Sequence, residues 1–261
     1  GSGTGILLAG NWLQLRAGAS SSAVCSGNTN NSTTVTAVFL QNSAGIGIDA
    51  ANLSALARIP VTFSATLGNI SNAEPSIQAN GIATATFTSN GTAGTATVNA
   101  RVDNVPLSDV LAQRSITVNA LPVINNQPPA RAVCSGNEAI FTVNASGASL
   151  TYNWFRGATQ LNDGPTISGS IIAGATTATL SIQNPGTADI GTNYNVRIID
   201  NGCPVFSNFT QLSVAPLQLL NASGSAFHNI TATDFTMNDA SCARIALVQP
   251  SGGAPVSGNL S

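Results

Sequence analysis

The chain has 261 residues and a net charge of −2, from eight arginines, ten acidic residues and no lysine. Its arginines are scattered singly, which argues against a nucleic-acid interface, because phosphate binding needs clustered basic side chains. No apolar run reaches the roughly 20 residues of a membrane-spanning helix. With 7% charged residues and many Thr, Ser, Asn and Gly, the composition favours strands and turns over helices and predicts an all-β protein.

An internal repeat divides the chain. The hexapeptide AVCSGN occurs at 23–28 and again at 132–137, and the similar stretches SITVNALP (115–122) and QLSVAP (211–216) each run into a proline. Each AVCSGN is therefore expected to open a module, and each strand before a proline to close it. The expected divisions are an N-terminal strand segment at 1–23 that could end a preceding module, a first domain at 24–122, a second at 131–216 and an incomplete third β module at 217–261. VINNQPPA (123–130) is expected to be an extended linker, because two adjacent prolines stiffen it.

Alternation of apolar and polar residues predicts most of the strands. In GTATVNARVD (94–103), Ala96, Val98, Ala100 and Val102 share one face. A helical turn is plausible only at 49–58 or 108–114. Short strands bounded by Gly, Asn, Asp or Pro predict tandem sandwiches of antiparallel sheets joined by a proline-containing linker. The strand segments, in chain order, are 60–66, 82–88, 94–103, 139–145, 178–183, 193–200 and 210–214.

The first module resembles a bacterial family. Residues 59–103 contain PVTFSAT, NGIATATFTS and AGTATVNARV, and they are similar to the group 1 Ig-like repeat of the invasin and intimin adhesins. The resemblance implies an immunoglobulin-like sandwich from a large bacterial surface adhesin. Residues 42–58 are longer than the corresponding link in that family and are expected to form a local insertion.

The second module resembles the immunoglobulin superfamily directly. YNWFRGATQL (152–161) is similar to the strand that carries the buried tryptophan, here Trp154. The segment 176–198 is similar to the approach to a tyrosine corner, with Asp189 and Tyr194 in the corner positions. These three residues are expected to define the core. Val196 stands where the family has its second cysteine, so the usual inter-sheet disulfide is absent.

The four cysteines are therefore expected to pair differently. Cys134 near the start of the second module and Cys203 at a late turn are the predicted disulfide. The first module has Val105 where a counterpart of Cys203 would stand, so Cys25 lacks a partner within its own module. Cys242 is also unpaired in the visible sequence. Cys25 and Cys242 could bridge each other within or between chains, or Cys242 could pair with a cysteine further along.

No pattern predicts catalysis or a cofactor. The single histidine, His228, has no accompanying ligand or nucleophile motif, and no two cysteines have C-x-x-C spacing. The two glutamates, Glu74 and Glu138, lie in turn contexts rather than as a catalytic pair. We expect a protein that is not an enzyme, with no catalytic residue, no cofactor and no metal.

The functional hypothesis is a structural or adhesive segment of a repeat-built extracellular protein on a bacterial surface. Expected partners are neighbouring Ig-like modules or other copies of the same protein, with host-surface or matrix glycans and proteins as further partners. No nucleic acid and no membrane span in this segment are expected. The alternative is a subunit of a pilus-like filament assembled head-to-tail by strand exchange. A third hypothesis is an accessory domain of a secreted hydrolase.

Overall fold

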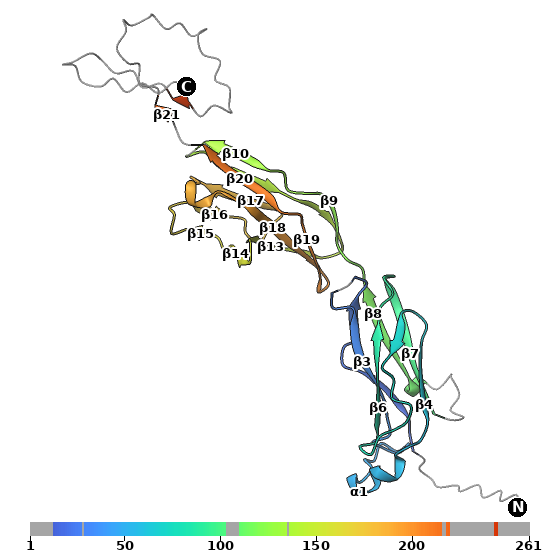
Figure 1. The fold of residues 1–261 in the computed structure, drawn as a ribbon. Coiled ribbons are helices and arrows are strands. Elements are labelled where there is room, and N and C mark those ends of the chain that lie inside the picture. The colour runs from blue at the N-terminus through green and yellow to red at the C-terminus, as the bar shows by residue number, and fades with distance from the viewer. Residues whose placement is uncertain are drawn as a thin grey trace, which may run out of the picture. The chain divides into compact units, whose positions relative to one another are not determined.

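The structure is a computed structural model that describes residues 13–27, 29–102, 110–134 and 136–215, and the backbone of 218–219 and 243–244. The chain forms two compact units (Figure 1). The first unit consists of Gly1–Pro122 together with Gly147–Leu150 and Ile199–Val205. The second consists of Val123–Ser146, Thr151–Ile198 and Phe206–Ser261. Two short segments from later in the sequence thus belong to the first unit.

The first unit contains two four-stranded sheets. Every strand pair in these sheets is antiparallel except β2–β8, which is parallel. This is the arrangement of an immunoglobulin-like sandwich in which the first strand divides between the two sheets. One sheet has the order β1 (Arg16–Ala19), β3 (Ser32–Val38), β6 (Ile82–Thr88), β5 (Asn69–Ser71), and the other β2 (Ala23–Cys25), β8 (Gln113–Asn119), β7 (Gly94–Val102), β4 (Val61–Ala65).

The core of the first unit comes from strict alternation. In β7 the residues at even positions from Ala96 to Val102 are buried, and in β6 Ala83, Ala85 and Phe87 are buried. Because successive side chains of a strand point to opposite faces, one face of each strand enters the core and the other carries Thr, Asn and Arg. The sequence pattern predicted these inward faces correctly.

The second unit has a larger sheet with the same parallel pairing of first and last strands, here β10 with β20. The end of β18 and most of β19 are grouped with the first unit. One sheet has the order β10 (Arg131–Cys134), β20 (Thr210–Ala215), β18 (Gly191–Asp200), β13 (Leu150–Arg156), β14 (Thr159–Gln160), with β19 (Cys203–Phe206) paired to β18. The second sheet has the order β11 (Ala139–Thr142), β17 (Thr179–Gln183), β16 (Ile171–Ala173), β15 (Gly164–Pro165).

Helical structure within the described residues is limited to short turns. The insertion at 42–58 contains α1 (Ala50–Leu53), whose first turn is capped by the Asp49 side chain accepting from the Ala51 N–H at 2.9 Å. A 3₁₀ turn follows at Ser54–Leu56, and others occur at Val110–Ala112 and Thr187–Asp189. No helix of the described part of the chain has the length and apolar character that crossing a membrane requires.

The all-β fold of tandem Ig-like sandwiches is confirmed, but the units do not begin where the sequence divisions place them. β1 is the edge strand beside β3, so the described part of the segment 1–23 belongs to the first unit rather than to a preceding module. The first half of the expected linker is β9 (Val123–Asn126), which pairs with β12 (Asn144–Ser146). The second unit therefore begins at Val123. The expected third module at 217–261 lies outside the described residues, apart from the parallel backbone pair β21 (Gln218–Leu219) and β22 (Ala243–Arg244).

Candidate functional site

The most distinctive site is a disulfide in the first unit, and the strand β2 supplies its first cysteine. β2 pairs in parallel with β8, which places Cys25 opposite Asn119. The chain then turns away: the Cys25 N–H donates to the Asn30 carbonyl oxygen, and the Ser26 N–H donates to the Asn119 carbonyl oxygen, both at 2.8 Å. The end of the AVC strand is thus fixed at the exit of β8.

A two-residue turn supplies the second cysteine. β18 ends at Asp200, β19 begins at Cys203, and the intervening Asn201 and Gly202 have φ angles of 47° and 81°. Positive φ at both central residues defines the type I′ hairpin turn, for which Asn-Gly is the favoured sequence. The DNGC stretch therefore fixes Cys203 as the first residue of the returning strand.

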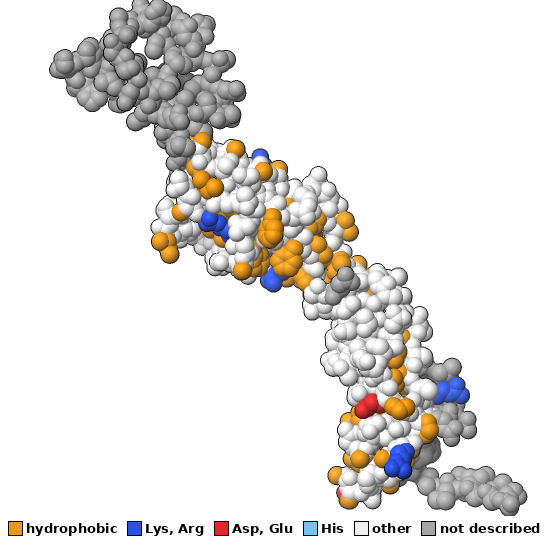
Figure 2. Space-filling view, in the orientation of Figure 1, with side chains coloured by type: hydrophobic (Ala, Val, Ile, Leu, Met, Phe, Trp, Pro, Cys, Tyr) orange, Lys and Arg blue, Asp and Glu red, His pale blue; other side chains and the backbone are white. Residues whose placement is uncertain are grey.

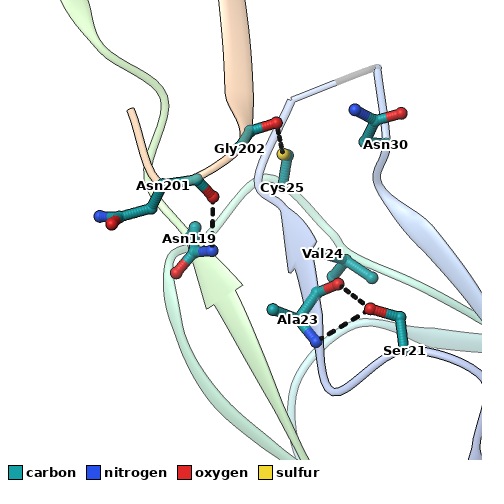
Figure 3. A pocket seen from close by; sticks show the side chains of 8 residues that line it. All are labelled: Ser21, Ala23, Val24, Cys25, Asn30, Asn119, Asn201 and Gly202. Atoms are coloured by element: carbon teal, nitrogen blue, oxygen red, sulfur yellow. Dashed lines mark hydrogen bonds between the residues drawn. The ribbon is translucent and has the colours of Figure 1, made fainter. Parts of the chain in front are cut away.

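Cys25 and Cys203 form a disulfide, with their Cα atoms 5.5 Å apart and 178 positions separating them in the sequence. Both side chains are buried. The Asn119 side-chain amide donates to the Asn201 carbonyl oxygen at 3.1 Å (Figure 3). Cys25 Sγ lies 3.9 Å from the Gly202 carbonyl oxygen, a contact without a hydrogen bond because a disulfide sulfur carries no hydrogen. We call Cys25, Asn119, Asn201, Gly202 and Cys203 the cysteine junction.

Most of the cysteine junction lines a depression of the first unit (Figure 3). The lining consists of Cys25, Asn119, Asn201 and Gly202 of the junction together with Ser21, Ala23, Val24 and Asn30. Ser21 closes a local turn there, donating from Oγ to the Ala23 carbonyl oxygen at 2.7 Å (Figure 3). The lining offers amides and backbone groups but no ionisable side chain, so the depression has no means of acid–base chemistry.

A buried carboxylate braces the turn that carries Cys203. Asp200 accepts hydrogen bonds from the backbone N–H groups of Ala148 and Ser149, each at 2.8 Å, and it is 4% exposed. Gly147 permits this approach, because a Cβ atom there would lie 2.5 Å from the Asp200 carboxylate oxygen. The segments 147–150 and 199–205, which both belong to the first unit, are held together by these bonds.

The predicted Cys134–Cys203 disulfide is wrong, because Cys203 bonds to Cys25. The sequence had left Cys25 open, as unpaired or as bonded to Cys242 or to another chain. In the sheet register Cys134 lies opposite Ala215, beyond the Leu212 that faces the start of β18 at Gly191. Cys203 follows the opposite end of β18, a strand of 10 residues that spans roughly 30 Å. Bridged cysteines need Cα atoms within about 7 Å, so strand geometry separates the predicted pair.

The structure describes only one of the other two cysteines. Cys134 is disulfide-bonded in the structure. Cys242 lies outside the described residues, as does His228. The repeat itself could have corrected the pairing. Cys25 and Cys134 occupy equivalent positions in AVCSGN, so if Cys134 paired within its own module, Cys25 would be expected to pair within its own module as well. The first module contains no second cysteine, which argued against a partner for Cys134 within its own module.

The three expected core residues lie together in the second unit. Trp154 on β13 is fully buried, with its indole N–H donating to the Thr177 carbonyl oxygen at 2.9 Å. Tyr194 on β18 is 1% exposed, and its hydroxyl donates to the Asp189 carbonyl oxygen at 2.6 Å, which is the bond of a tyrosine corner. Phe141 lies between them, with ring centroids 6.1 Å from Trp154 and 5.5 Å from Tyr194.

Burial also changes the acidity of this corner. Desolvation raises the pKa of Tyr194 to about 12, against the opposing charge of Arg156, whose guanidinium carbon lies 5.6 Å from the ring centroid. The Asp189 side chain is 6% exposed and accepts from the Gly186 N–H at 2.8 Å and from the Ser170 hydroxyl at 3.1 Å. These carboxylate bonds shape the turn that precedes β18, so Asp189 has a structural place rather than a catalytic one.

An exposed apolar patch marks the outer face of β13, β18 and β19. Phe155 and Phe206 lie 6.1 Å apart between ring centroids, and Phe206 is 54% exposed. The Arg197 guanidinium lies 5.4 Å from the Phe155 ring and donates to the Asn153 side chain at 3.2 Å. Figure 2 shows hydrophobic side chains gathered over this part of the second unit. We call Phe155, Phe206 and Arg197 the aromatic patch; clusters of this kind mark contact surfaces more often than single exposed apolar residues do.

No metal centre is found among the described residues, where no three His, Cys, Asp or Glu side chains gather closely enough to hold an ion. Glu74, one of the two glutamates, accepts from the Thr84 N–H at 2.7 Å and from the Thr84 hydroxyl at 3.1 Å, which ties the turn before β6 to that strand.

Known proteins with a similar arrangement are found among solved structures. No protein-family model matches the chain, and no curated protein sequence is similar to it. Solved structures with a similar arrangement include the tandem Ig repeats of Dlar, at 14% identity and a TM-score of 0.31 over 78% of this chain and 100% of that one. Drosophila OTK extracellular domains 3–5 match at 16% identity and 0.40, over 77% and 62%. The Yersinia pseudotuberculosis adhesin InvE matches at 19% identity and 0.31, over 76% and 58%.

Proposed function

We propose that the chain is a non-catalytic, structural segment of an extracellular bacterial surface protein built from tandem Ig-like modules. The observation that carries the proposal is the Cys25–Cys203 disulfide, which bridges 178 positions of sequence. Disulfides persist in oxidising compartments and are rare in the cytosol. An extracellular location also agrees with a composition that is rich in Thr, Ser and Asn and low in charged residues.

The disulfide suits a protein that transmits tension. If the chain is pulled from its two ends, force reaches Cys25 and crosses the sulfur bridge directly to Cys203. The residues between them, which include β3 to β8 and β9 to β18, are left out of the stretched path. Opening that loop would add roughly 600 Å of contour length, at about 3.4 Å for each of its 178 positions. A stalk that must hold its length under load benefits from such a bypass.

Single-molecule force spectroscopy on the full chain, held at its two ends, tests this function. In oxidising buffer the fully extended chain should be shorter by roughly 600 Å than in reducing buffer. A Cys25→Ser/Cys203→Ser double variant, fully reduced, should extend as far as the reduced natural chain, which controls for effects of the thiol reagent. Equal extension of the natural chain in both buffers would refute the proposal.

A second candidate function, adhesion, is favoured by the aromatic patch. Phe206 and Phe155 offer apolar area beside a guanidinium, a combination that is common where proteins bind protein or glycan surfaces. We expect Phe206→Ser to lower binding of the chain to an array of printed glycans and matrix proteins. Ile167→Ser is the matched control, because Ile167 is fully exposed and lies outside the patch. Equal loss in both variants, or no binding by the natural chain, would remove this candidate.

A further inference from the structure

The outer face of β18 holds a guanidinium group beside two aromatic rings. The even-numbered residues of this strand from 194 to 198 are buried in the core, so the odd-numbered side chains face the other way. The Arg197 guanidinium carbon lies 5.4 Å from the Phe155 ring centroid, and the Phe155 and Phe206 centroids lie 6.1 Å apart. The aromatic patch is therefore one continuous surface of three side chains from β13, β18 and β19.

Within the described residues, no carboxylate forms an ion pair with Arg197. Its Nη2 donates to the Asn153 side-chain oxygen at 3.2 Å, and its Nε has no hydrogen-bond partner. The nearest carboxylate along the chain, that of Asp200, accepts instead from the backbone N–H groups of Ala148 and Ser149. On the face of the second unit that Figure 2 shows, basic side chains are visible beside the hydrophobic ones, and no acidic side chain is. This surface therefore favours an anionic ligand.

A buried amide lies on the same face of β18. Asn195 precedes Arg197 by two positions, so the two side chains leave the strand on the same side. The Asn195 side chain is 7% exposed, and its Oδ1 has no hydrogen-bond partner. The face thus holds an unused acceptor at Asn195 and an unused donor at Arg197 Nε. Hydroxyl groups both donate and accept, so a ligand rich in hydroxyls can satisfy both atoms.

Access to these two atoms requires a side-chain movement, because both lie below the surface. Phe206, in the same patch, is 54% exposed, and exposed side chains change rotamer within picoseconds to nanoseconds. Such a movement leaves the strand pairing of β18 intact.

The chemistry of the patch fits a sugar that carries a carboxylate. The faces of aromatic rings are electron-rich and attract C–H groups, such as those on the face of a pyranose ring. A planar guanidinium pairs with a carboxylate through parallel hydrogen bonds. A neutral sugar would leave Arg197 without a counter-ion, and a simple anion would leave the Phe206 ring uncovered. A uronic acid meets both requirements, because its carboxylate is attached directly to the pyranose ring.

The small extent of the patch favours a sugar over a protein partner. A stable protein complex usually covers about 800 Å² on each partner. The aromatic patch consists of three side chains, an area that suits one or two sugar rings better than a folded protein.

We propose that the aromatic patch, together with Asn195, is a binding subsite for a uronic acid residue of a glycan. The pyranose face packs on Phe206, the carboxylate pairs with the Arg197 guanidinium, and the sugar hydroxyls bond to Asn195 Oδ1 and Arg197 Nε. This proposal names the ligand of the adhesion candidate described above, and it rests on that candidate.

Titration of the natural full chain with trigalacturonic acid, followed by NMR of the arginine Nε–H groups, tests the subsite. The Nε–H resonance that is missing from the spectrum of Arg197→Gln should shift on binding. The fully methyl-esterified trisaccharide has the same rings without charge and should bind at least about tenfold more weakly. Equal affinity for the acid and the ester would overturn the proposal. This comparison uses the natural chain alone, so it does not depend on the folding of a variant.

Substitution of the arginine tests the position of the charge. Arg197→Gln should weaken binding of trigalacturonic acid about tenfold or more, and Arg197→Lys, which keeps the charge but loses the planar fork, should weaken it less. Arg114→Gln is the matched control, because Arg114 is exposed on β8 of the first unit and its replacement changes the net charge equally. Circular dichroism checks that each variant is folded. Equal loss in Arg197→Gln and Arg114→Gln would attribute binding to net charge and contradict the subsite.

Further probes separate this proposal from the adhesion candidate. Pentaglutamate offers carboxylates without sugar rings, and sialyllactose offers a different acidic sugar; binding of either as tightly as trigalacturonic acid would overturn the uronic acid assignment. If Phe206→Ser lowers binding to the printed array but the natural chain does not bind trigalacturonic acid, the adhesion candidate stands and the subsite falls. If the natural chain binds neither the array nor trigalacturonic acid, both fall.

Discussion

The two units reach the same sandwich with different cores. The first is packed with Ala, Val and Ile at alternate positions, and Phe87 is the one aromatic side chain among its fully buried large residues. The second is centred on Trp154, Phe141 and Tyr194, whose rings contact one another. Small side chains bury little area each, so the first unit depends on many regular pairs, whereas the second depends on a few large contacts.

The cysteine junction belongs to the unit with the lighter core. A cross-link stabilises a fold by restricting its unfolded chain, and this contribution does not require large side chains inside. The junction thus adds to the first unit a contribution that does not depend on the size of its core side chains. The lesson is that similar strand orders can conceal different sources of stability, and substitutions can separate them.

Removing the junction should have the largest effect. A Cys25→Ser/Cys203→Ser variant loses the restriction on a loop of 178 positions, which corresponds to about 5 kcal/mol from loop-closure entropy. Guanidinium denaturation followed by circular dichroism measures the loss. Asn119→Ala is the matched control, since it removes only the bond to Asn201 and should cost about 1 kcal/mol. If the double variant is as stable as Asn119→Ala, the cross-link does not stabilise the first unit as proposed.

Truncating the largest side chain of each core tests the comparison between the two cores directly. Trp154→Ala and Phe87→Ala should each destabilise by about 3–5 kcal/mol, because both side chains are fully buried. The loss at Trp154 should be the greater, since that variant also leaves the Thr177 carbonyl without its donor. Urea denaturation measures both, with Ile167→Ala as an exposed control. A smaller loss at Trp154 than at Phe87 would contradict the assignment of the second core to aromatic contacts.

The tyrosine corner gives a smaller effect with a pH signature. Tyr194→Phe should cost about 1 kcal/mol at neutral pH through the lost bond to Asp189. The pKa of Tyr194 rises from 10.0 to about 12 in the folded state, so the folded protein retains a proton that the unfolded chain releases. The contribution is complete below pH 10 and is lost as the pH rises through about 12.

The pH signature can be measured without interference from lysine, which the chain lacks. Unfolding free energies at pH 9 and pH 11.5 should differ more for the natural chain than for Tyr194→Phe. In a Tyr152→Phe variant, absorbance at 295 nm reports on Tyr194 alone, since the chain has two tyrosines. Ionisation of Tyr194 near pH 10 in the folded variant would contradict the buried corner.

A single turn residue gives the finest test. Gly202→Ala should cost about 1 kcal/mol, because φ is 81° there and no neighbouring atom lies within 4 Å of an added Cβ. Gly186→Ala is the matched control, with equally open space but a φ of −108°. Thermal unfolding of both variants should show a lower midpoint for Gly202→Ala alone. Equal midpoints would show that the Asn-Gly turn is not what positions Cys203.

Much of the fold was predictable because one face of each long strand meets solvent. Alternation identified β4, β6 and β7 to within a residue or two, and the turn residues around them set their ends. β9 was not predicted, because it is short and mostly exposed and its sequence, VINN, does not alternate. The two prolines that follow it also favoured a linker over a strand. β1 lies within the predicted N-terminal strand segment, but its pairing with β3 was not predicted, because its sequence, RAGA, has little of the bulk that marks a strand.

The cysteine junction was not predictable from spacing alone. Which cysteines meet depends on the direction of β10 relative to β18, and strand direction is set by the pairing of β20 with both. The sequence predicted a turn at NGC, but it gave no sign that this turn belongs to the first unit. The role of Asp200 was equally hard to predict, because its carboxylate accepts from Ala148 and Ser149, about 50 positions earlier in the sequence.

The cysteine junction also restricts how such a gene can change. Ig-like repeats are commonly duplicated, deleted or shuffled as independent pieces, but here a segment that ends after Pro122 would leave Cys25 without Cys203. Its thiol would be free to join a second chain or to be oxidised. Deletion of the later sequence would therefore change the chemistry of the first unit as well.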